Sequence, residues 1–380
     1  MKTTLFHYSR PNWVEISSSG KPDSQKAQLI LCFGGKSELM DSLIYPSLKT
    51  KFPQAEIVLC STAGQISGGL VNDQGATAVC LEFEQTLVRP ASVNINNYKD
   101  SYQAGLALGS SLPPEDLIYM MILSDGSLVN GSELVKGLNE STGSKIPVTG
   151  GLAGDGTEFK STLVGLNGQA SEGMIVAIGF YGSQLQIHHG SQGGWETFGL
   201  EKKITRSIGN ILYEIEGQNA LDLYKKYLGP EAAELPKSAL FFPLSITIPG
   251  SNQAVVRTIL SIDEQNKSMI FAGDVPEGSS VRFMKANFNR LTDAAASAAR
   301  QTTINKQGPP VFALLISCVG RKIVLGPRVE EEVDAVAEAY GKNTILAGFY
   351  SYGEISPFNE GGDCQLHNQT MTITSFYELP

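Results

Sequence analysis

Three pairs of short apolar runs, each ending in a glycine-rich turn, recur along the chain. The first pair is AQLILCFGG (27–35) with AEIVLCSTAGQI (55–66), the second is LIYMMILSDG (117–126) with IPVTGGLAGD (146–155), and the third is PVFALLISCVGR (310–321) with NTILAGFYSYGEI (343–355). Continuous apolar runs of this length between turn residues are typical of buried strands. The repetition predicts one structural unit that is used three times.

The segment inside each pair has the pattern of a helix. These segments are SELMDSLIYPSLKTKF (37–52), where we expect an interruption at Pro46, GSELVKGLNESTG (131–143) and RVEEEVDAVAEAYG (328–341). A strand, a helix and a second strand in so few residues favour two parallel strands joined by a right-handed crossover.

Alternating segments that suit antiparallel strands follow each unit. They are ATAVCLEFE (76–84), TLVGLNG and GMIVAIGFYG (within 162–182), and QTMTITSFYE (369–378). Parallel pairs with antiparallel neighbours produce mixed sheets that helices cover on at least one face. We therefore expect an α/β fold with α+β character, in which mixed sheets are built from repeated strand-helix-strand units with glycine loops in two related halves.

The composition changes around YKKYLGPEAAELPKSALFFP (224–243), where a helical pattern ends at Gly229 and three prolines follow. We place a domain boundary there, between residues 1–230 and residues 231–380. The second part opens with the strand-like VVRTILSID and MIFAGDVPEG and continues with the alanine-rich ANFNRLTDAAASAARQ (286–301), which is a good helix by its spacing.

Charge and cysteine content exclude several classes of protein. The chain of 380 residues carries a formal charge of -9, and its basic residues are scattered, which argues against a nucleic-acid surface. No apolar run approaches the roughly 18 residues of a membrane span, so we expect a cytoplasmic protein without a membrane segment. The five cysteines have no CxxC pair or histidine at zinc spacing, and we expect neither a disulfide framework nor a metal site.

Several stretches together resemble the FIST domain family. STAG, LSDG, GGLAGD and NILYEIEGQNALDLYKKYLG resemble its N-terminal part, and VVRTIL, FAGDVPEG, SCVGR, GFYSYGEI and LHNQTMT resemble its C-terminal part. The resemblance implies a ligand-sensing module of bacterial and archaeal signalling and no catalytic reaction. Such modules often occur beside histidine kinases, cyclic-dinucleotide enzymes or chemoreceptors. We expect no output domain in this chain, so that signalling would act through a separate partner.

The glycine loops are the predicted ligand site, because the carboxyl ends of parallel strands are where α/β proteins hold ligands. Charges of both signs there would suit a small polar or zwitterionic ligand, such as one like an amino acid. The candidate ligand-binding residues are Gly64, Ser124, Asp125, Asp155, Arg321, Tyr352, Glu354, His367 and Gln369. Two structural alternatives stay open: Ser124 and Asp125 could instead cap the following helix, and His367 and Gln369, which share one face of a strand, could instead hold the end of the sheet.

A haem site is an alternative that the resemblance brings in, because a subset of the family resembles haem proteins that sense nitric oxide. Haem needs an axial ligand, and the candidates are His188, His189 and His367. His188 and His189 point to opposite faces of a strand, and a histidine at a strand end is more often solvated or hydrogen-bonded than bound to haem.

A cysteine-dependent enzyme is the second alternative. Cys318 lies close in sequence to Arg321, whose guanidinium would lower the thiol pKa, and His367 and Glu354 could complete a catalytic set. The apolar context FALLISCV favours simple burial instead, and no phosphate-binding GxxxxGK[ST] motif supports nucleotide hydrolysis.

Overall fold

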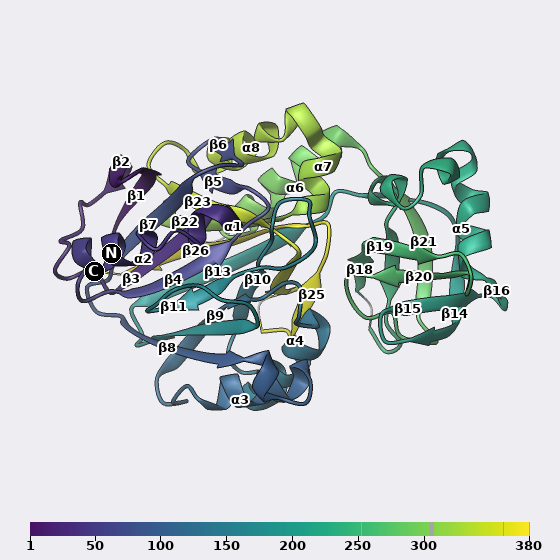
Figure 1. Cartoon of the computed structure of the whole chain (residues 1–380), viewed down its shortest axis with the longest axis horizontal. Helices are drawn as coiled ribbons and strands as arrows, with labels where there is room; N and C mark the ends of the chain where they lie inside the picture. Colours follow the sequence, from purple (N-terminus) through teal and green to yellow (C-terminus); the bar gives the residue numbers. More distant parts are fainter. Residues whose placement is uncertain (252, 304–307, 360, 380) are drawn as a thin grey trace.

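The computed structural model describes residues 1–380 except 252, 304–307, 360 and 380. Three six-stranded mixed sheets form the larger part of the molecule, which we call the body (Figure 1). In sheet order, the first contains β11 (Val164–Leu166), β4 (Glu56–Ser61), β3 (Leu29–Gly34), β7 (Ala76–Glu82), β1 (Lys2–Ser9) and β2 (Asn12–Ser19). The second contains β25 (Cys364–His367), β24 (Gly353–Pro357), β10 (Val148–Leu152), β9 (Leu117–Ser124), β12 (Met174–Tyr181) and β8 (Leu87–Asn94). The third contains β13 (Leu185–Gln192), β26 (Met371–Glu378), β22 (Phe312–Cys318), β23 (Ile345–Ser351), β5 (Gln65–Ser67) and β6 (Leu70–Asn72).

Each of these sheets is built around one of the predicted units. The parallel pairs are β3 with β4, β9 with β10, and β22 with β23, and the antiparallel neighbours are β7, β12 and β26. The helices that accompany the units are α1 (Lys36–Leu39) and α2 (Ile44–Lys51), α4 (Gly131–Thr142), and α7 (Val319–Leu325) and α8 (Glu330–Tyr340). The predicted α/β class, with mixed sheets of repeated units, is confirmed.

The units exchange strands in a cycle. After its glycine loop, the chain leaves β4 and enters the third sheet as β5, leaves β10 and enters the first sheet as β11, and leaves β23 and enters the second sheet as β24. The inner faces of the three sheets share one hydrophobic core, in which Phe33 stacks on Phe349 and Phe180 packs on Phe376. Because of this exchange, the carboxyl ends of the three parallel strand pairs lie close together, and so do the glycine loops that follow them.

One local prediction about the first unit is wrong. The helical break falls at residues 40–43, before Pro46, which lies in the first turn of α2, where its missing N–H costs nothing. The run 55–66 contains the predicted strand, β4, which ends at Ser61 before the glycine turn, and the chain then continues as β5 in another sheet.

A fourth sheet forms a smaller lobe, which we call the insert (residues 196–285). Its strands are β18 (Ala254–Arg257), β17 (Leu244–Thr247), β21 (Ser280–Lys285), β14 (Glu196–Ile208), β15 (Ile211–Ile215), β20 (Ser268–Phe271), β19 (Ile259–Asp263) and β16 (Gln218–Asn219). Together with α5 (Ala220–Leu228), η2 (Gly229–Glu234) and η3 (Lys237–Phe241) they enclose a core of their own. Figure 1 shows the insert beside the body, between β13 and α6 (Phe288–Gln301) in the chain. The boundary at residue 230 lies in η2, inside this lobe, and stays a prediction about the two family halves.

The remaining helical elements are η1 (Ile95–Asn97), α3 (Ser101–Ser110) and η4 (Gly326–Arg328). Helices α3 and α4 pack so closely that a side chain on Gly105 or Gly137 would meet the backbone of the other helix. The helices in the described part of the chain are all too short or too polar to span a bilayer.

Candidate functional site: the pocket between body and insert

The three glycine loops meet, as strand exchange requires. The amide of Gly154 donates to the carbonyl of Ser61, Ala63 and Tyr350 bond through their backbones, and the amide of Tyr352 donates to the carbonyl of Leu152. Each loop is thus bonded to the next around a ring. These hydrogen bonds hold the loops to one another, and the space that a ligand could occupy lies beside them.

A pocket of about 360 Å³ lies next to this ring, between the body and the insert. The body contributes Gly126, Ser127, Leu128, Val129, Asn130, Gly131, Leu152, Phe159, Lys160, Cys318, Val319, Gly320 and Tyr352, and the insert contributes Asn210, Leu240, Thr258, Leu260, Phe271, Ala272 and Gly273. The body residues follow the carboxyl ends of β9, β10, β22 and β23. Ligand pockets of α/β proteins commonly lie at such strand ends and at interfaces between domains.

An aromatic wall forms one side of the pocket. The ring of Phe159 stacks on that of Tyr352, with centroids 4.7 Å apart and planes 19° apart. The Tyr352 hydroxyl bonds Asp155, whose carboxylate also accepts the amides of Phe159, Lys160 and Ser161. Burial raises the pKa of Asp155, but these hydrogen bonds outweigh it and leave the pKa below its usual range. Asp155 therefore fixes the loop that presents Phe159 to the pocket.

A second hollow of about 640 Å³ lies across the same loops, at the ends of β3 and β4. It is polar, and its charged lining residues are Lys36, Glu38, Asp73, Asp155, Glu158, Lys160 and Lys322. Several of these charges pair with one another, as Lys322 does with Asp73 and Lys160 with Glu158. Gly64 also lies here, with φ +131°, and a Cβ on it would meet the Lys322 ammonium at 2.6 Å.

The nine candidate residues divide into two groups by position. Tyr352 lines the pocket, and Gly64 and Asp155 line the second hollow. The side chains of the other six are buried against protein partners, and their contact with a ligand stays a prediction.

Ser124 and Asp125 stabilise a turn of the loop. The Ser124 hydroxyl donates to the carbonyl of Asp125, and the Asp125 carboxylate accepts the amides of Ser127, Leu128 and Gly173. The helix-capping alternative is wrong in detail, because the cap of α4 is Asn130.

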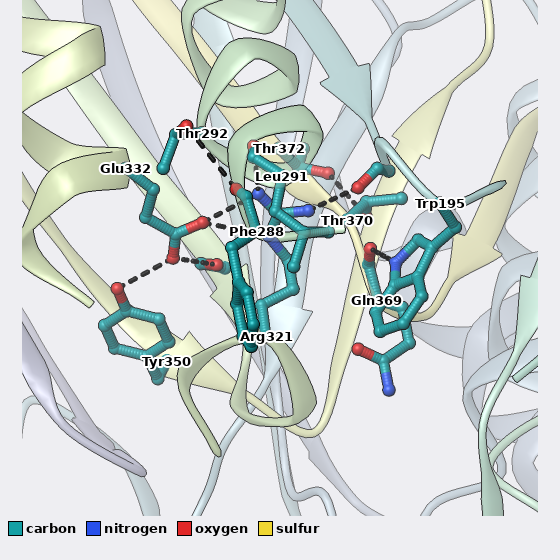
Figure 2. Close-up of polar contacts among 12 residues, drawn as sticks. Trp195, Phe288, Leu291, Thr292, Arg321, Glu332, Tyr350, Gln369, Thr370 and Thr372 are labelled. Atoms are coloured by element: carbon teal, nitrogen blue, oxygen red, sulfur yellow. Dashed lines mark hydrogen bonds and ion pairs between the residues drawn. The ribbon is translucent and has the colours of Figure 1, made fainter. Parts of the chain in front are cut away.

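Arg321 is the centre of a buried polar network (Figure 2). Its guanidinium donates two hydrogen bonds to Glu332 and one each to the carbonyls of Gly193 and Leu291. Glu332 also accepts the hydroxyls of Ser317 and Tyr350. Gly193 precedes the insert and Leu291 follows it, so Arg321 binds both points where the chain crosses between body and insert.

Gln369 and Trp195 complete the same region. The Trp195 indole, in the first crossing, donates to the Gln369 carbonyl at 2.8 Å (Figure 2). The Gln369 side chain lies against Gly320, where a Cβ would come within 2.4 Å of its amide nitrogen. We call the set Gly193, Trp195, Leu291, Arg321, Glu332 and Gln369 the joint.

Glu354 and His367 face each other in the pairing of β24 with β25. The Glu354 carboxyl accepts the hydroxyls of Ser351 and Thr370, but burial dominates and raises its pKa to about 8. His367 Nε2 is 2.9 Å from the carbonyl of Ser356, and burial lowers the pKa of the ring to about 4. Two neutral side chains are therefore the favoured state near neutral pH, in agreement with the alternative in which His367 holds the sheet end.

The structure does not support the alternative in which Arg321 lowers the pKa of the Cys318 thiol. Burial raises the pKa of this thiol, and the opposite effect of Arg321 does not offset it. The Arg321 guanidinium is committed to Glu332, so it provides little stabilisation for a thiolate.

Sequence reasoning missed most of the pocket wall. Phe159 lies in the loop that directly follows the second glycine unit, and this position is a signal that could have indicated it. Asn210, Thr258 and Phe271 lie in NILYEIEGQNALDLYKKYLG, VVRTIL and FAGDVPEG, which are among the stretches that carry the family resemblance. The sequence does not show that these residues reach the pocket, because only the packing of the insert brings them there.

Comparison with known proteins agrees with this architecture. The FIST N domain profile matches residues 28–218, and the FIST C domain profile matches residues 220–357. The chain belongs to the FIST family. FIST domains bind small ligands and function in signalling.

The curated relatives are described only as uncharacterized proteins. Proteins of two Mycobacterium tuberculosis strains, CDC 1551 / Oshkosh and H37Rv, are each 24% identical over 188 residues, which is 46% of this chain and 47% of theirs. The chain thus aligns with about half the length of these relatives. A Methanocaldococcus jannaschii protein is 21% identical over 384 residues, 90% of this chain and 72% of its own.

Among solved structures, a cyanuric acid hydrolase from A. caulinodans aligns over 93% of this chain and 91% of its own, with 8% identity and a TM-score of 0.35. A likeness at this level carries no argument about fold or function.

Proposed function

We propose that this FIST protein is a cytoplasmic sensor that binds a small molecule in the pocket between body and insert. The observation that carries the proposal is the composition of the pocket wall, to which both parts of the molecule contribute. A ligand held there contacts both parts and favours the arrangement in which both walls are in place. Ligand binding then changes the populations of two arrangements by its difference in affinity for them.

The joint provides a route by which the pocket can influence the crossings. Val319 and Gly320 line the pocket at the start of α7, and the next residue of this helix is Arg321. On the other side, Gly320 touches Gln369, whose carbonyl holds Trp195. A displacement of the first turn of α7 would therefore reach both crossings within one or two residues.

The partner in this proposal is a separate signalling protein, such as a histidine kinase or a cyclic-dinucleotide enzyme. Signalling by FIST domains supports a partner of this class. A cytoplasmic location is consistent with the cysteines, because all five are unpaired and buried, as in proteins of a reducing compartment.

The residues around the pocket do not fit a haem. Among its described lining residues there is no histidine or methionine, the Cys318 thiol is kept protonated by burial, and the Tyr352 hydroxyl is bound to Asp155. His367 is bonded to Ser356, and His188 and His189 lie on β13, outside the pocket lining. The nitric-oxide alternative therefore has no support from this pocket and stays a prediction from the family resemblance. Nor does any cluster of three or more His, Cys, Asp or Glu side chains, among the described residues, have the arrangement of a metal site.

The proposal is tested by filling the pocket. Ala272→Phe adds a ring to the wall of the insert, whereas Leu200→Phe places the same ring at an exposed position of the same lobe. In a thermal-shift screen of metabolites, we expect at least one compound to stabilise the wild type and the Leu200→Phe variant but not Ala272→Phe. A stabilising compound that acts equally on all three proteins would overturn the assignment of the pocket.

The signalling part of the proposal needs a second measurement. Because the native cysteines are buried, single cysteines introduced at the exposed positions Ile16 and Ile208 can be spin-labelled selectively. We expect the compound to narrow or shift the distance distribution between these labels on body and insert, and to change the autophosphorylation of a partner kinase. An unchanged distribution at saturation would contradict transmission through the joint.

A further inference from the structure

The charge of the pocket differs from what a zwitterionic ligand needs. Among the described lining residues there is no Asp, Glu, Arg or His, and the single charged side chain is Lys160. That side chain is 75% exposed, and its ammonium lies 2.6 Å from Glu158. It is therefore a solvated, already paired charge at the rim. A ligand ammonium in the pocket would have no carboxylate to pair with. A ligand carboxylate would have only the Lys160 ammonium, which already pairs with Glu158 and is screened by water.

Burying an unpartnered charge costs far more than one hydrogen bond returns, whereas an uncharged polar group needs only a hydrogen-bond partner. The pocket offers partners of that kind. Its polar side chains other than Lys160 are neutral, namely those of Ser127, Asn130, Asn210, Thr258, Cys318 and Tyr352. Asn130 already caps α4 and donates to Asp274, and Asn210 donates to the carbonyl of Phe271, so Ser127 and Thr258 are the hydroxyls that a ligand could meet most directly. The chemistry of the wall therefore selects an uncharged ligand.

Thr258 provides an independent observation about the chemistry of the ligand. The residue lines the pocket and is 5% exposed, and its hydroxyl has no hydrogen-bond partner among the described residues. Buried hydroxyls without a partner are rare in folded proteins, because the lost bonds to water are not replaced. A polar atom of a bound molecule would satisfy this hydroxyl.

The aromatic wall indicates the shape of the ligand. Phe159 is 46% exposed and has φ +54°, a conformation that a bulky residue rarely adopts. The three amides bonded to Asp155 hold the loop in this state, and the phenyl ring thereby lies face to face on the ring of Tyr352. Phe271 adds a third ring from the insert. Flat rings stack well on such a surface.

We propose that the pocket binds a flat aromatic molecule that is uncharged and carries a hydrogen-bonding group for Thr258, and that it discriminates against amino acids. This assignment rests on the proposed function, since it specifies the ligand class of the same pocket.

Four compounds with one ring system and different charges test this assignment. They are indole-3-acetamide, which is neutral, indole-3-acetate, which is anionic, tryptamine, which is cationic, and tryptophan, which is zwitterionic. Calorimetry measures their affinities for the full chain, and only binding that Ala272→Phe abolishes is compared. We expect the acetamide to bind at least about tenfold more tightly than tryptamine and tryptophan, with the acetate between them.

Two variants separate the roles of the wall residues. Thr258→Val keeps the shape of the side chain and removes the hydroxyl, and Phe159→Leu removes the ring. We expect each to weaken binding of the acetamide, by about fivefold to tenfold for Thr258→Val. We also expect Thr258→Val to raise the melting temperature of the free protein by about 1 to 2 °C, because an unsatisfied hydroxyl is gone. A folded Thr258→Val protein with unchanged affinity would contradict the hydroxyl contact.

Tryptophan or tryptamine binding as tightly as the acetamide would overturn the selection for an uncharged ligand. Failure of all four compounds to bind would overturn the indole-like aromatic class. In either case the proposed function would stand if another metabolite stabilised the wild type but not Ala272→Phe, so the two failures are distinguishable.

Discussion

The pocket and the joint lie on the two sides of the first turn of α7, but they use opposite chemistry. The pocket wall is apolar with neutral polar groups, one of which, the Thr258 hydroxyl, has no hydrogen-bond partner in the described part of the chain. The joint contains a charged pair, Arg321 and Glu332, that is fully buried, and each nitrogen of the Arg321 guanidinium is bonded. In this region the charged motif residues therefore fix how body and insert connect, and the apolar and neutral polar residues of the pocket wall form the space for a ligand.

The largest effect is expected from breaking the ion pair of the joint. Arg321→Met leaves Glu332 charged in a buried site, and we expect a loss of about 3–5 kcal/mol in the free energy of unfolding. The double variant Arg321→Met with Glu332→Leu removes both charges and should recover a large part of this loss. Urea unfolding measures both, and a double variant less stable than Arg321→Met would show that the pair acts differently from our description.

Glu354 should make stability depend on pH. Its folded pKa of about 8 lies above the usual 4.5, so its contribution to the free energy of unfolding is present at low pH and is lost as the pH rises through 8. His367 acts in the opposite direction: its folded pKa of about 4 lies below 6.5, so its contribution is present above 6.5 and is lost as the pH falls through 4.

Of these two contributions, only that of Glu354 changes between pH 6.5 and 8. We expect the free energy of unfolding to fall there by up to about 1.4 kcal/mol per pH unit. Glu354→Gln, which imitates the protonated side chain, should abolish most of this slope. Denaturant titrations at several pH values measure it. Equal slopes for wild type and variant would contradict the buried neutral carboxyl.

Trp195→Phe should have a smaller effect. It keeps the packed ring and removes the hydrogen bond to the Gln369 carbonyl, and we expect a cost of about 1–2 kcal/mol. The informative measurement is the distance distribution between labels at positions 16 and 208, which should broaden if the indole holds the first crossing. If the Trp195→Phe variant kept the wild-type distance distribution, the role of Trp195 would be limited to packing.

The smallest effect is expected in the pocket. Thr258→Val should stabilise the free protein by about 1 kcal/mol or less, as removal of an unpartnered hydroxyl does. Thermal unfolding tests the sign. A loss of stability would mean that the hydroxyl already has a partner in the free protein, and it would weaken the contrast between pocket and joint.

The site could be predicted only in part, for a physical reason that particular residues illustrate. Glycine loops after strands indicated the correct end of the sheets, and Tyr352, Gly64 and Asp155 do line hollows there. Arg321 and Glu354 are candidates because charged residues near loops suggest ligand contacts, but their partners, Glu332 and Thr370, come from other segments. Whether a charge is paired depends on such distant neighbours.

The sequence by itself determined the secondary structure and the repeated unit, because strand and helix patterns are local: a run such as FALLISC is buried on both faces, and AAASAARQ forms a helix wherever it is packed. Only the tertiary structure decided that each unit passes one strand to the next sheet, that residues 196–285 form a separate lobe, and that this lobe closes the pocket. Those features depend on contacts between residues far apart in the chain, whose free energy no local pattern records.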